Sequence, residues 1–383
     1  MKSITIKTIK FHVVSLPYVE PLRTSFGVEP EKSAVLIELE TTNGIIGWGE
    51  GATEINPGYG YETIATGLHI SNEFLIPCLV GQTIEKATDV PALMRSVRGN
   101  NFTKAGFEAA VWDALARAND MRLADYFASF LPEGHQSTNR ATVGVSIGIQ
   151  ETVEDTLVII RKRLGQGYGR IKLKIKRGWD VELVRGVRAE FPDISMMVDA
   201  NSDYTLDDAE HLLQLDEFNL LMIEQPLAYY DIYEHGQLQK RLKTRVCLDE
   251  SVKSANDLLL ALQIDATRIL NLKPARVGGY SESLKIYNIS VENNLPLWVG
   301  GMLETGVGRA ANTAFASLPG ITLPCDISAT ERYFNPDITE PAFELGPEST
   351  LAVPDGYGIG VDVQPDRLEE AKARWQDNYP YKK

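Results

Sequence analysis

The sequence predicts an α/β protein in which a parallel barrel follows an α+β section. From about residue 141, short apolar strands alternate with amphipathic helices through eight repeats, and parallel strands joined by crossover helices close into barrels. The residues before this point combine a hairpin pattern with helical stretches. We therefore expect two structural parts, with residues 1–135 in the first and residues 136–330 in the barrel.

The first part contains the signals of a hairpin and of a buried helix. Residues 33–42 (SAVLIELETT) and 45–51 (IIGWGEG) are joined by Asn43-Gly44, a dipeptide favoured in type I′ turns. In residues 104–120, Phe107, Val111 and Leu115 recur at helical spacing. The N-terminal stretch MKSITIKTIKFHVV alternates like a strand and lacks the apolar core of a signal peptide. These patterns predict an α+β section.

The barrel strands are expected in eight apolar segments. These segments are residues 141–149, 170–175, 195–201, 220–226, 245–251, 268–274, 295–301 and 321–328. Helices are expected between them, for example over residues 205–218 and 278–292. No helix is expected directly after the eighth strand, and residues 331–383 are expected to pack back on the first section.

The composition excludes several classes of function. Acidic residues outnumber basic ones by 52 to 38, giving a net charge of −14, which disfavours nucleic acid or an anionic membrane as a partner. No apolar run is long enough to span a bilayer, so we expect a cytoplasmic protein. Cys78, Cys247 and Cys325 are far apart, which indicates neither a disulfide framework nor a zinc–thiolate site.

Five charged residues stand at the expected C-terminal ends of consecutive strands. They are Lys174, Asp199, Glu224, Asp249 and Lys273, separated by 25, 25, 25 and 24 residues. Each step is one βα unit, so the five side chains are predicted to face the same mouth of the barrel, where barrel enzymes keep their chemistry. Singly, each could be a helix cap or a solvated charge. Their shared spacing favours a functional site.

The three carboxylates predict a metal site. Asp199, Glu224 and Asp249 would repel one another unless a cation lay among them. Ligands that offer only oxygen select a hard divalent ion, so Mg²⁺ is the first expectation and Mn²⁺ the second.

The lysines predict an acid/base pair. Strands two and six lie roughly across an eight-stranded barrel, so Lys174 and Lys273 are expected to face each other over the metal. Lys172, one step deeper on the face of Lys174, adds positive charge, and we expect the pKa of the catalytic amines to be lowered. Lys176 could be solvated or could face the substrate. This arrangement suits removal of a proton next to a carboxylate, followed by racemisation or by loss of water.

These motifs resemble the enolase superfamily, in its muconate-lactonizing-enzyme-like subgroup. The resemblance rests on Lys172-Leu-Lys174, Asp199, Glu224, Asp249 and Lys273, and extends over essentially the whole chain. It implies an α/β fold consisting of a (β/α)7β modified TIM barrel with an α+β capping domain formed by the N-terminal section and the C-terminal tail. Within the subgroup, the segments PLRTSFG, GWGEG, NLKPARVGGY and SATERYFNPDITEP resemble o-succinylbenzoate synthases and N-acylamino-acid (N-succinylamino-acid) racemases.

The resemblance implies further properties. Lys174 and Lys273 would be the acid/base pair, the substrate would be a small carboxylate, and the protein would be a homo-oligomer, dimeric or octameric. An o-succinylbenzoate synthase would belong to menaquinone biosynthesis. The shared residues leave dehydratase and racemase equally open, and a muconate cycloisomerase or a non-catalytic metabolite-binding relative also stays possible.

Two relatives within the superfamily fit less well. Mandelate-racemase-like members use a histidine base late in the barrel, whereas this chain's five histidines (His12, His69, His135, His211 and His235) lie away from the expected strand ends. Dipeptide epimerases carry Asp-x-Asp after strand eight, where this chain has Asp326-Ile-Ser328. A free amino group on the substrate is therefore disfavoured.

Substrate contacts are predicted by position. On the first section, Leu22, Phe26 and Tyr59 are expected on loops that close over the mouth and offer apolar surface to an acyl chain or a ring. On the barrel, the expected substrate-binding residues are Ser146, Lys172, Asn201, Gly301 and Met302.

Overall fold

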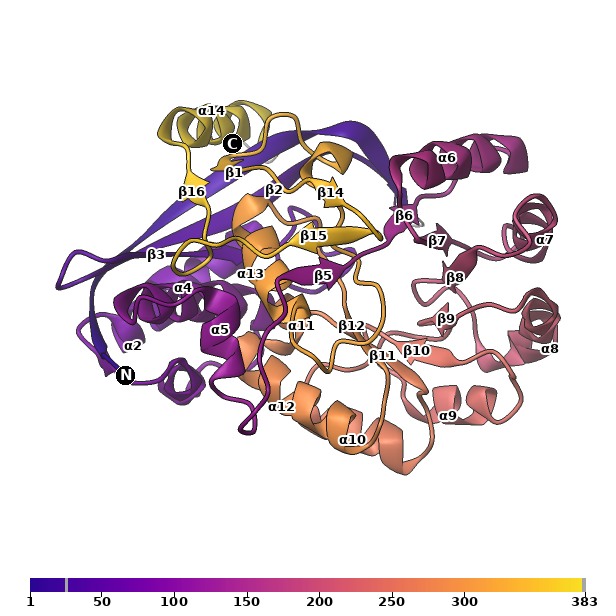
Figure 1. The fold of residues 1–383 in the computed structure, drawn as a ribbon, viewed down its shortest axis with the longest axis horizontal. Helices are drawn as coiled ribbons and strands as arrows, with labels where there is room; N and C mark the ends of the chain where they lie inside the picture. Colours follow the sequence, from indigo (N-terminus) through magenta and orange to yellow (C-terminus); the bar gives the residue numbers. More distant parts are fainter. Residues whose placement is uncertain (25–26, 381–383) are drawn as a thin grey trace.

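The computed structural model describes residues 1–24 and 27–380 and contains the predicted barrel. Seven parallel strands form one sheet in the order β12-β11-β10-β9-β8-β7-β6 (Figure 1). The strands are β6 (Val145–Ile147), β7 (Arg170–Lys174), β8 (Ser195–Asp199), β9 (Ile223–Glu224), β10 (Val246–Leu248), β11 (Ile269–Leu272) and β12 (Leu297–Val299). They are shorter than the predicted segments, but each lies inside one of them.

The eighth predicted strand is not a regular strand. Pro324, in the middle of residues 321–328, has no N–H to donate to a ladder. The segment still closes the barrel, because Asp326 N donates to Val299 O while Cys325 N donates to Thr142 O and Gly144 N donates to Cys325 O. The two residues Cys325 and Asp326 therefore take the place of a strand between β12 and the start of β6.

Helices follow the barrel strands and cover their outer side, as Figure 1 shows for α6 to α9. They are α6 (Val153–Gln166), α7 (Val181–Glu190), α8 (Ala209–Leu212), α9 (Tyr233–Gln239), α10 (Ala255–Gln263), α11 (Pro274–Val277), α12 (Tyr280–Glu292) and α13 (Gly306–Ala316). The helix predicted over residues 205–218 is divided: α8 is a single α turn between the 3-10 segments Leu206–Asp208 and Leu213–Phe218.

The first section is built on an antiparallel sheet in the order β3-β2-β1-β4. Its strands are β1 (Ile4–Thr24), β2 (Gly27–Thr41), β3 (Ile46–Gly51) and β4 (Thr83–Ile84). The helices of this section are α1 (Ile64–Ile70), α2 (Ile76–Leu79), α3 (Val90–Leu93), α4 (Asn101–Ala118) and α5 (Leu123–Ala128). A π turn lies at Ser71–Leu75 and a 3-10 turn at Ala87–Asp89. The predicted hairpin is β2–β3. Its turn is not type I′, because only Gly44 of the Asn43-Gly44 pair has a positive φ, at 82°.

The glycines of GWGEG let α4 lie directly on β3. A Cβ at Gly47 would overlap the backbone of Ala110, and one at Gly49 would overlap the backbone of Gly106. Almost every α4 residue is buried, including Phe107, so this helix is apolar on more than one face.

The C-terminal segment joins both parts of the molecule. After the 3-10 turn Thr330–Arg332, β15 (Thr350–Ala352) pairs with β5 (Arg140–Thr142) and β14 (Leu345–Gly346), and β13 (Thr339–Glu340) pairs with β16 (Asp362–Val363). The final helix α14 (Pro365–Asn378) lies beside β1 (Figure 1), and Arg374 contacts Glu31 at 2.7 Å. The division into residues 1–135, 136–330 and 331–383 stays a prediction. Among the described residues, no helix has the length and apolar character needed to cross a membrane.

Candidate active site

The five residues predicted from spacing meet at one end of the barrel. Lys174 pairs with Asp199 across β7 and β8, and Asp199 pairs with Glu224 across β8 and β9. Glu224 then lies opposite Cys247, so Asp249 extends two residues further along its strand. A stagger of two keeps the side chain on the same face, because side-chain direction alternates with period two. The regular spacing therefore placed all five on the inner face.

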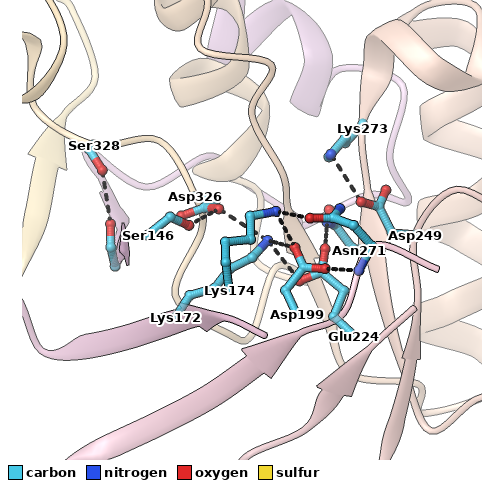
Figure 2. Close-up of polar contacts among 12 residues, drawn as sticks. Ser146, Lys172, Lys174, Asp199, Glu224, Asp249, Asn271, Lys273, Asp326 and Ser328 are labelled. Carbon is cyan, nitrogen blue, oxygen red and sulfur yellow. Dashed lines mark hydrogen bonds and ion pairs between the residues drawn. The ribbon is translucent and has the colours of Figure 1, made fainter. Parts of the chain in front are cut away.

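Two lysines of β7 neutralise the carboxylates beside them. Nζ of Lys172 lies 2.9 Å from Oδ2 of Asp199 and 2.8 Å from Oε2 of Glu224. Nζ of Lys174 lies 2.7 Å from the same Asp199 oxygen and donates to Oδ1 of Asn201 at 2.6 Å. Figure 2 shows both amines on one side of the carboxylate group and Lys273 on the other. The predicted opposition of Lys174 and Lys273 is thus present.

Lys273 is held by two groups. Its Nζ lies 3.0 Å from Oδ2 of Asp249 and donates to the hydroxyl of Tyr59 at 2.8 Å. Asp249 also pairs with the guanidinium of Arg276, in the helix that begins directly after Lys273. A loop of the first section, which carries Tyr59, is thereby tied to the barrel mouth.

The direction of the Lys273 pKa shift differs from the prediction. Burial by itself would lower the pKa of Lys273, but the carboxylate of Asp249 outweighs it, so the pKa is raised. Lys172 behaves alike: burial opposes its charge, and Asp199 and Glu224 raise its pKa well above the ordinary value. The expectation of a lowered pKa is wrong for Lys273 in this arrangement, because its amine is paired with the carboxylate of Asp249.

The carboxylates themselves are strongly perturbed. Burial, reinforced by the nearby charge of Asp199, raises the pKa of Glu224 to about 8. Burial also opposes ionisation of Asp199, but Lys172 and Lys174 outweigh it and lower its pKa. A site with such paired and opposed charges has the electrostatic character of a catalytic centre.

The predicted substrate residues surround one cavity of about 200 Å³ next to these charges. Of the predicted residues, it is lined by Tyr59, Ser146, Lys172, Lys174, Asn201, Lys273, Gly301 and Met302. Phe26 and the side chain of Leu22 lie outside the described residues. Lys176 is exposed and does not line the cavity, which resolves its position in favour of solvent.

Several cavity and supporting residues were not predicted. Asn271 donates to Oε1 of Glu224 at 2.7 Å, and Arg276 pairs with Asp249. The alternation rule could have indicated Asn271, which stands two residues before Lys273 on the same strand face. Glu29 and Glu54 also line the cavity from the first section, and no local pattern distinguishes them.

The donor set fits a hard divalent cation. Asp199, Glu224 and Asp249 are all buried and offer only oxygen. Among the described residues, none donates a hydrogen bond to Oε2 of Glu224, although the Lys172 ammonium lies 2.8 Å from it. In the part of the chain that the structure describes, no three His, Cys, Asp or Glu side chains converge as a metal cluster; the carboxylates instead face lysines.

Comparison with known proteins agrees with this geometry. Residues 6–127 match the N-terminal domain of mandelate racemase / muconate lactonizing enzyme, and residues 158–367 match the enolase C-terminal domain-like family. The chain belongs to the enolase superfamily. Superfamily membership establishes the capped, modified TIM barrel as the fold and agrees with an enzyme.

Individual superfamily members are similar over nearly the whole chain. An o-succinylbenzoate synthase of Geobacillus kaustophilus is 44% identical over 91% of this chain and 91% of its own length. An N-succinylamino acid racemase of Amycolatopsis is 42% identical over 94% of this chain and 96% of its own. The solved structure of an enolase-superfamily member from Listeria innocua is 40% identical, covers 96% of this chain and 97% of its own, and has a TM-score of 0.91.

Proposed function

We propose that this enolase-superfamily member is a Mg²⁺-dependent enzyme that removes the proton next to a substrate carboxylate. The proposed reactions are dehydration to o-succinylbenzoate, racemisation of N-acylamino acids such as N-succinylamino acids, or both. The observation that supports this most directly is the placement of Lys174 and Lys273 on opposite sides of three buried carboxylates. Relatives named for each reaction have almost the same identity to this chain.

Asp199, Glu224 and Asp249 are the residues that would hold Mg²⁺. When bound, Mg²⁺ supplies positive charge that stabilises the enediolate form of the substrate carboxylate. Mn²⁺ offers the same chemistry with the same oxygen ligands. Sharing the Asp249 charge with a cation would also weaken the ion pair that raises the pKa of Lys273.

The two lysines would exchange protons with the substrate. In racemisation, one amine takes the α-proton from one face and the other ammonium returns a proton to the opposite face. In dehydration, Lys174 would take the α-proton and pass it to the departing hydroxyl, while the Lys273 ammonium stabilises the anion. Tyr59 would orient Lys273 through its 2.8 Å hydrogen bond. A cytoplasmic location and a homo-oligomeric state, dimeric or octameric, stay predictions.

The test is proton NMR in D₂O with Mg²⁺ and a single enantiomer of an N-succinyl- or N-acetylamino acid. We expect the α-proton signal to disappear and the optical purity of the substrate to be lost. Lys174→Ala and Lys273→Ala should both abolish racemisation. Lys176→Ala is the matched control, because this lysine is exposed outside the cavity. Parallel assays use the cyclohexadiene precursor of o-succinylbenzoate and cis,cis-muconate. Dehydration of the cyclohexadiene precursor without α-proton exchange in N-acylamino acids would assign the synthase reaction alone. Inactivity on both proposed substrate classes would contradict the proposal.

A further inference from the structure

Lys174 is held by one charged and one uncharged oxygen. Its ammonium lies 2.7 Å from Oδ2 of Asp199 and donates to Oδ1 of Asn201 at 2.6 Å. Under the proposed function Asp199 would share its charge with Mg²⁺, so its hold on the ammonium would weaken. The amide oxygen of Asn201 accepts a hydrogen bond from lysine both as ammonium and as free amine. Asn201 is therefore the contact that can keep Lys174 in place while it gains and loses a proton.

The amide of Asn201 can serve Lys174 in only one of its two orientations. If the amide turned over, its NH₂ group would face the ammonium, and donors would meet donors. The backbone does not choose between the orientations. Asn201 lies two residues beyond the end of β8 with a φ of 42°, and its N–H donates to Oδ1 of Asp199 at 2.9 Å. Turning the amide changes neither feature, so a group on the far side of the amide must fix it.

That group is Glu250, which follows β10. Nδ2 of Asn201 donates to Oε1 of Glu250 at 3.1 Å. The carboxylate is buried, and its Oε2 has no hydrogen-bond partner among the described residues. Glu250 does not line the cavity that contains the lysines, but an adjoining cavity of about 540 Å³. Its side chain therefore reaches the site through Asn201 and not through the substrate.

We propose that Glu250 is a positioning residue, which fixes the amide of Asn201 and thereby holds Lys174 in its catalytic position. This inference rests on the proposed function, in which Lys174 takes and returns the α-proton. The role needs a hydrogen-bond acceptor and not a charge. It concerns one base alone, because Lys273 lies on the opposite side of the carboxylates and donates to Tyr59 instead. Loss of Glu250 should therefore damage the work of the two lysines unequally.

The test follows exchange of the α-proton for deuterium in N-succinyl-L-phenylalanine and, separately, in N-succinyl-D-phenylalanine. Proton NMR in D₂O with saturating Mg²⁺ gives kcat and KM for each. In a two-base site each lysine takes the proton of one enantiomer and can return a deuteron to the same face. Glu250→Ala removes the acceptor for Asn201, so kcat should fall about tenfold or more for one enantiomer. For the other enantiomer it should stay within about threefold, and KM should change little for both.

Three further variants isolate the hydrogen bond. Glu250→Gln keeps an oxygen acceptor and removes the charge, so both exchange rates should stay within about threefold of the wild type. Adding Glu250→Ala to Asn201→Ala should cause no further loss, because the effect passes through Asn201. Glu182→Ala, at an exposed site on α7, is the matched control and should change neither rate. Thermal unfolding shows whether each variant is folded.

Several outcomes would overturn the role of Glu250. Equal losses for the two enantiomers, or no loss, would show that Glu250 does not act on Lys174 alone. A Glu250→Gln variant as impaired as Glu250→Ala would assign the effect to the charge.

The inference and the proposed function can fail separately. If the wild type exchanges neither enantiomer, the racemase reaction fails. The same variants are then compared in dehydration of the cyclohexadiene precursor, where Lys174 acts as the base and Glu250→Ala should lower kcat about tenfold or more. If both reactions fail, the proposed function fails, and a crystal structure of Glu250→Ala decides the inference. An unchanged bond between Lys174 and Asn201 rejects it, and a turned amide or a displaced amine supports it.

Discussion

The ammonium group of Lys172 lies 2.8 Å from the carboxylate of Glu224, and both side chains are almost completely buried, with 3% and 0% of their surfaces exposed. Lys172 also contacts Asp199 at 2.9 Å. One buried amine therefore compensates two carboxylates of the site, so the stability of the barrel mouth depends on the charge of Lys172.

Replacing this charge should destabilise the protein. Lys172→Met keeps the length of the side chain but leaves Glu224 without its ion pair and Asp199 with Lys174 alone, which costs about 3–5 kcal/mol for a buried pair. Urea denaturation at pH 8 measures the loss. Added Mg²⁺ should raise the melting temperature of Lys172→Met more than that of the wild type, since a bound cation replaces the missing charge. Equal shifts would argue against Mg²⁺ at these carboxylates, and Lys176→Met is the exposed control.

The bond between Glu50 and α13 predicts a coupled effect on stability and substrate binding. Glu50→Ala removes the acceptor for Thr305 and Gly308 at a helix N-terminus, so we expect a loss of about 2–3 kcal/mol by urea denaturation. The loop before α13 carries Gly301 and Met302, so KM should rise while kcat changes less. Glu73→Ala, on an exposed site, should change neither. An unchanged KM would show that this loop keeps its position without Glu50.

Glu108 predicts a pH dependence of stability. Burial raises its pKa from 4.5 to about 7, against the hydrogen bonds donated by Ser281 and Trp112. Between these pH values the folded state binds more protons than the unfolded state, so this contribution to the free energy of unfolding is fully present below pH 4.5 and is lost as the pH rises through 7.

The contribution of Glu108 amounts to about 3 kcal/mol, at 1.36 kcal/mol per pH unit. Glu108→Gln cannot ionise, so the difference in unfolding free energy between wild type and variant should change by this amount between pH 4.5 and pH 8. Chemical denaturation across this range measures it. A difference that stays constant with pH would show that Glu108 does not titrate in this range.

Gly279 occupies a position that we expect to tolerate no side chain. Gly279 directly precedes α12 and has a φ of +127°. A Cβ there would overlap the carboxylate of Glu108, which lies in α4. Gly279→Ala should therefore cost about 3 kcal/mol or more, from backbone strain together with the clash. Combining it with Glu108→Ala should recover the part caused by the clash. Gly165→Ala, in α6 with nothing near its Cβ, should be neutral or stabilising by up to about 1 kcal/mol.

The sequence by itself determined the barrel and the inner-face residues. Both follow from local periodicities: alternation along a strand directs Lys172 and Lys174 to one face, and the 25-residue repeat brings Asp199, Glu224 and Asp249 to the same mouth. The hairpin and the helix that became α4 were also visible, because their signals lie within about 20 residues of chain.

Only the tertiary structure decided how these residues are paired. Tyr59 and Lys273 are 214 residues apart in sequence, yet the hydroxyl and the amine lie 2.8 Å from each other. Glu54 lines the same cavity from a loop of the first section, although it is far from the barrel residues in the sequence. The reversed pKa shift of Lys273 has the same origin, because it arises from the proximity of Asp249 on another strand. Charge compensation depends on distances in space, and no periodicity along the chain encodes those distances.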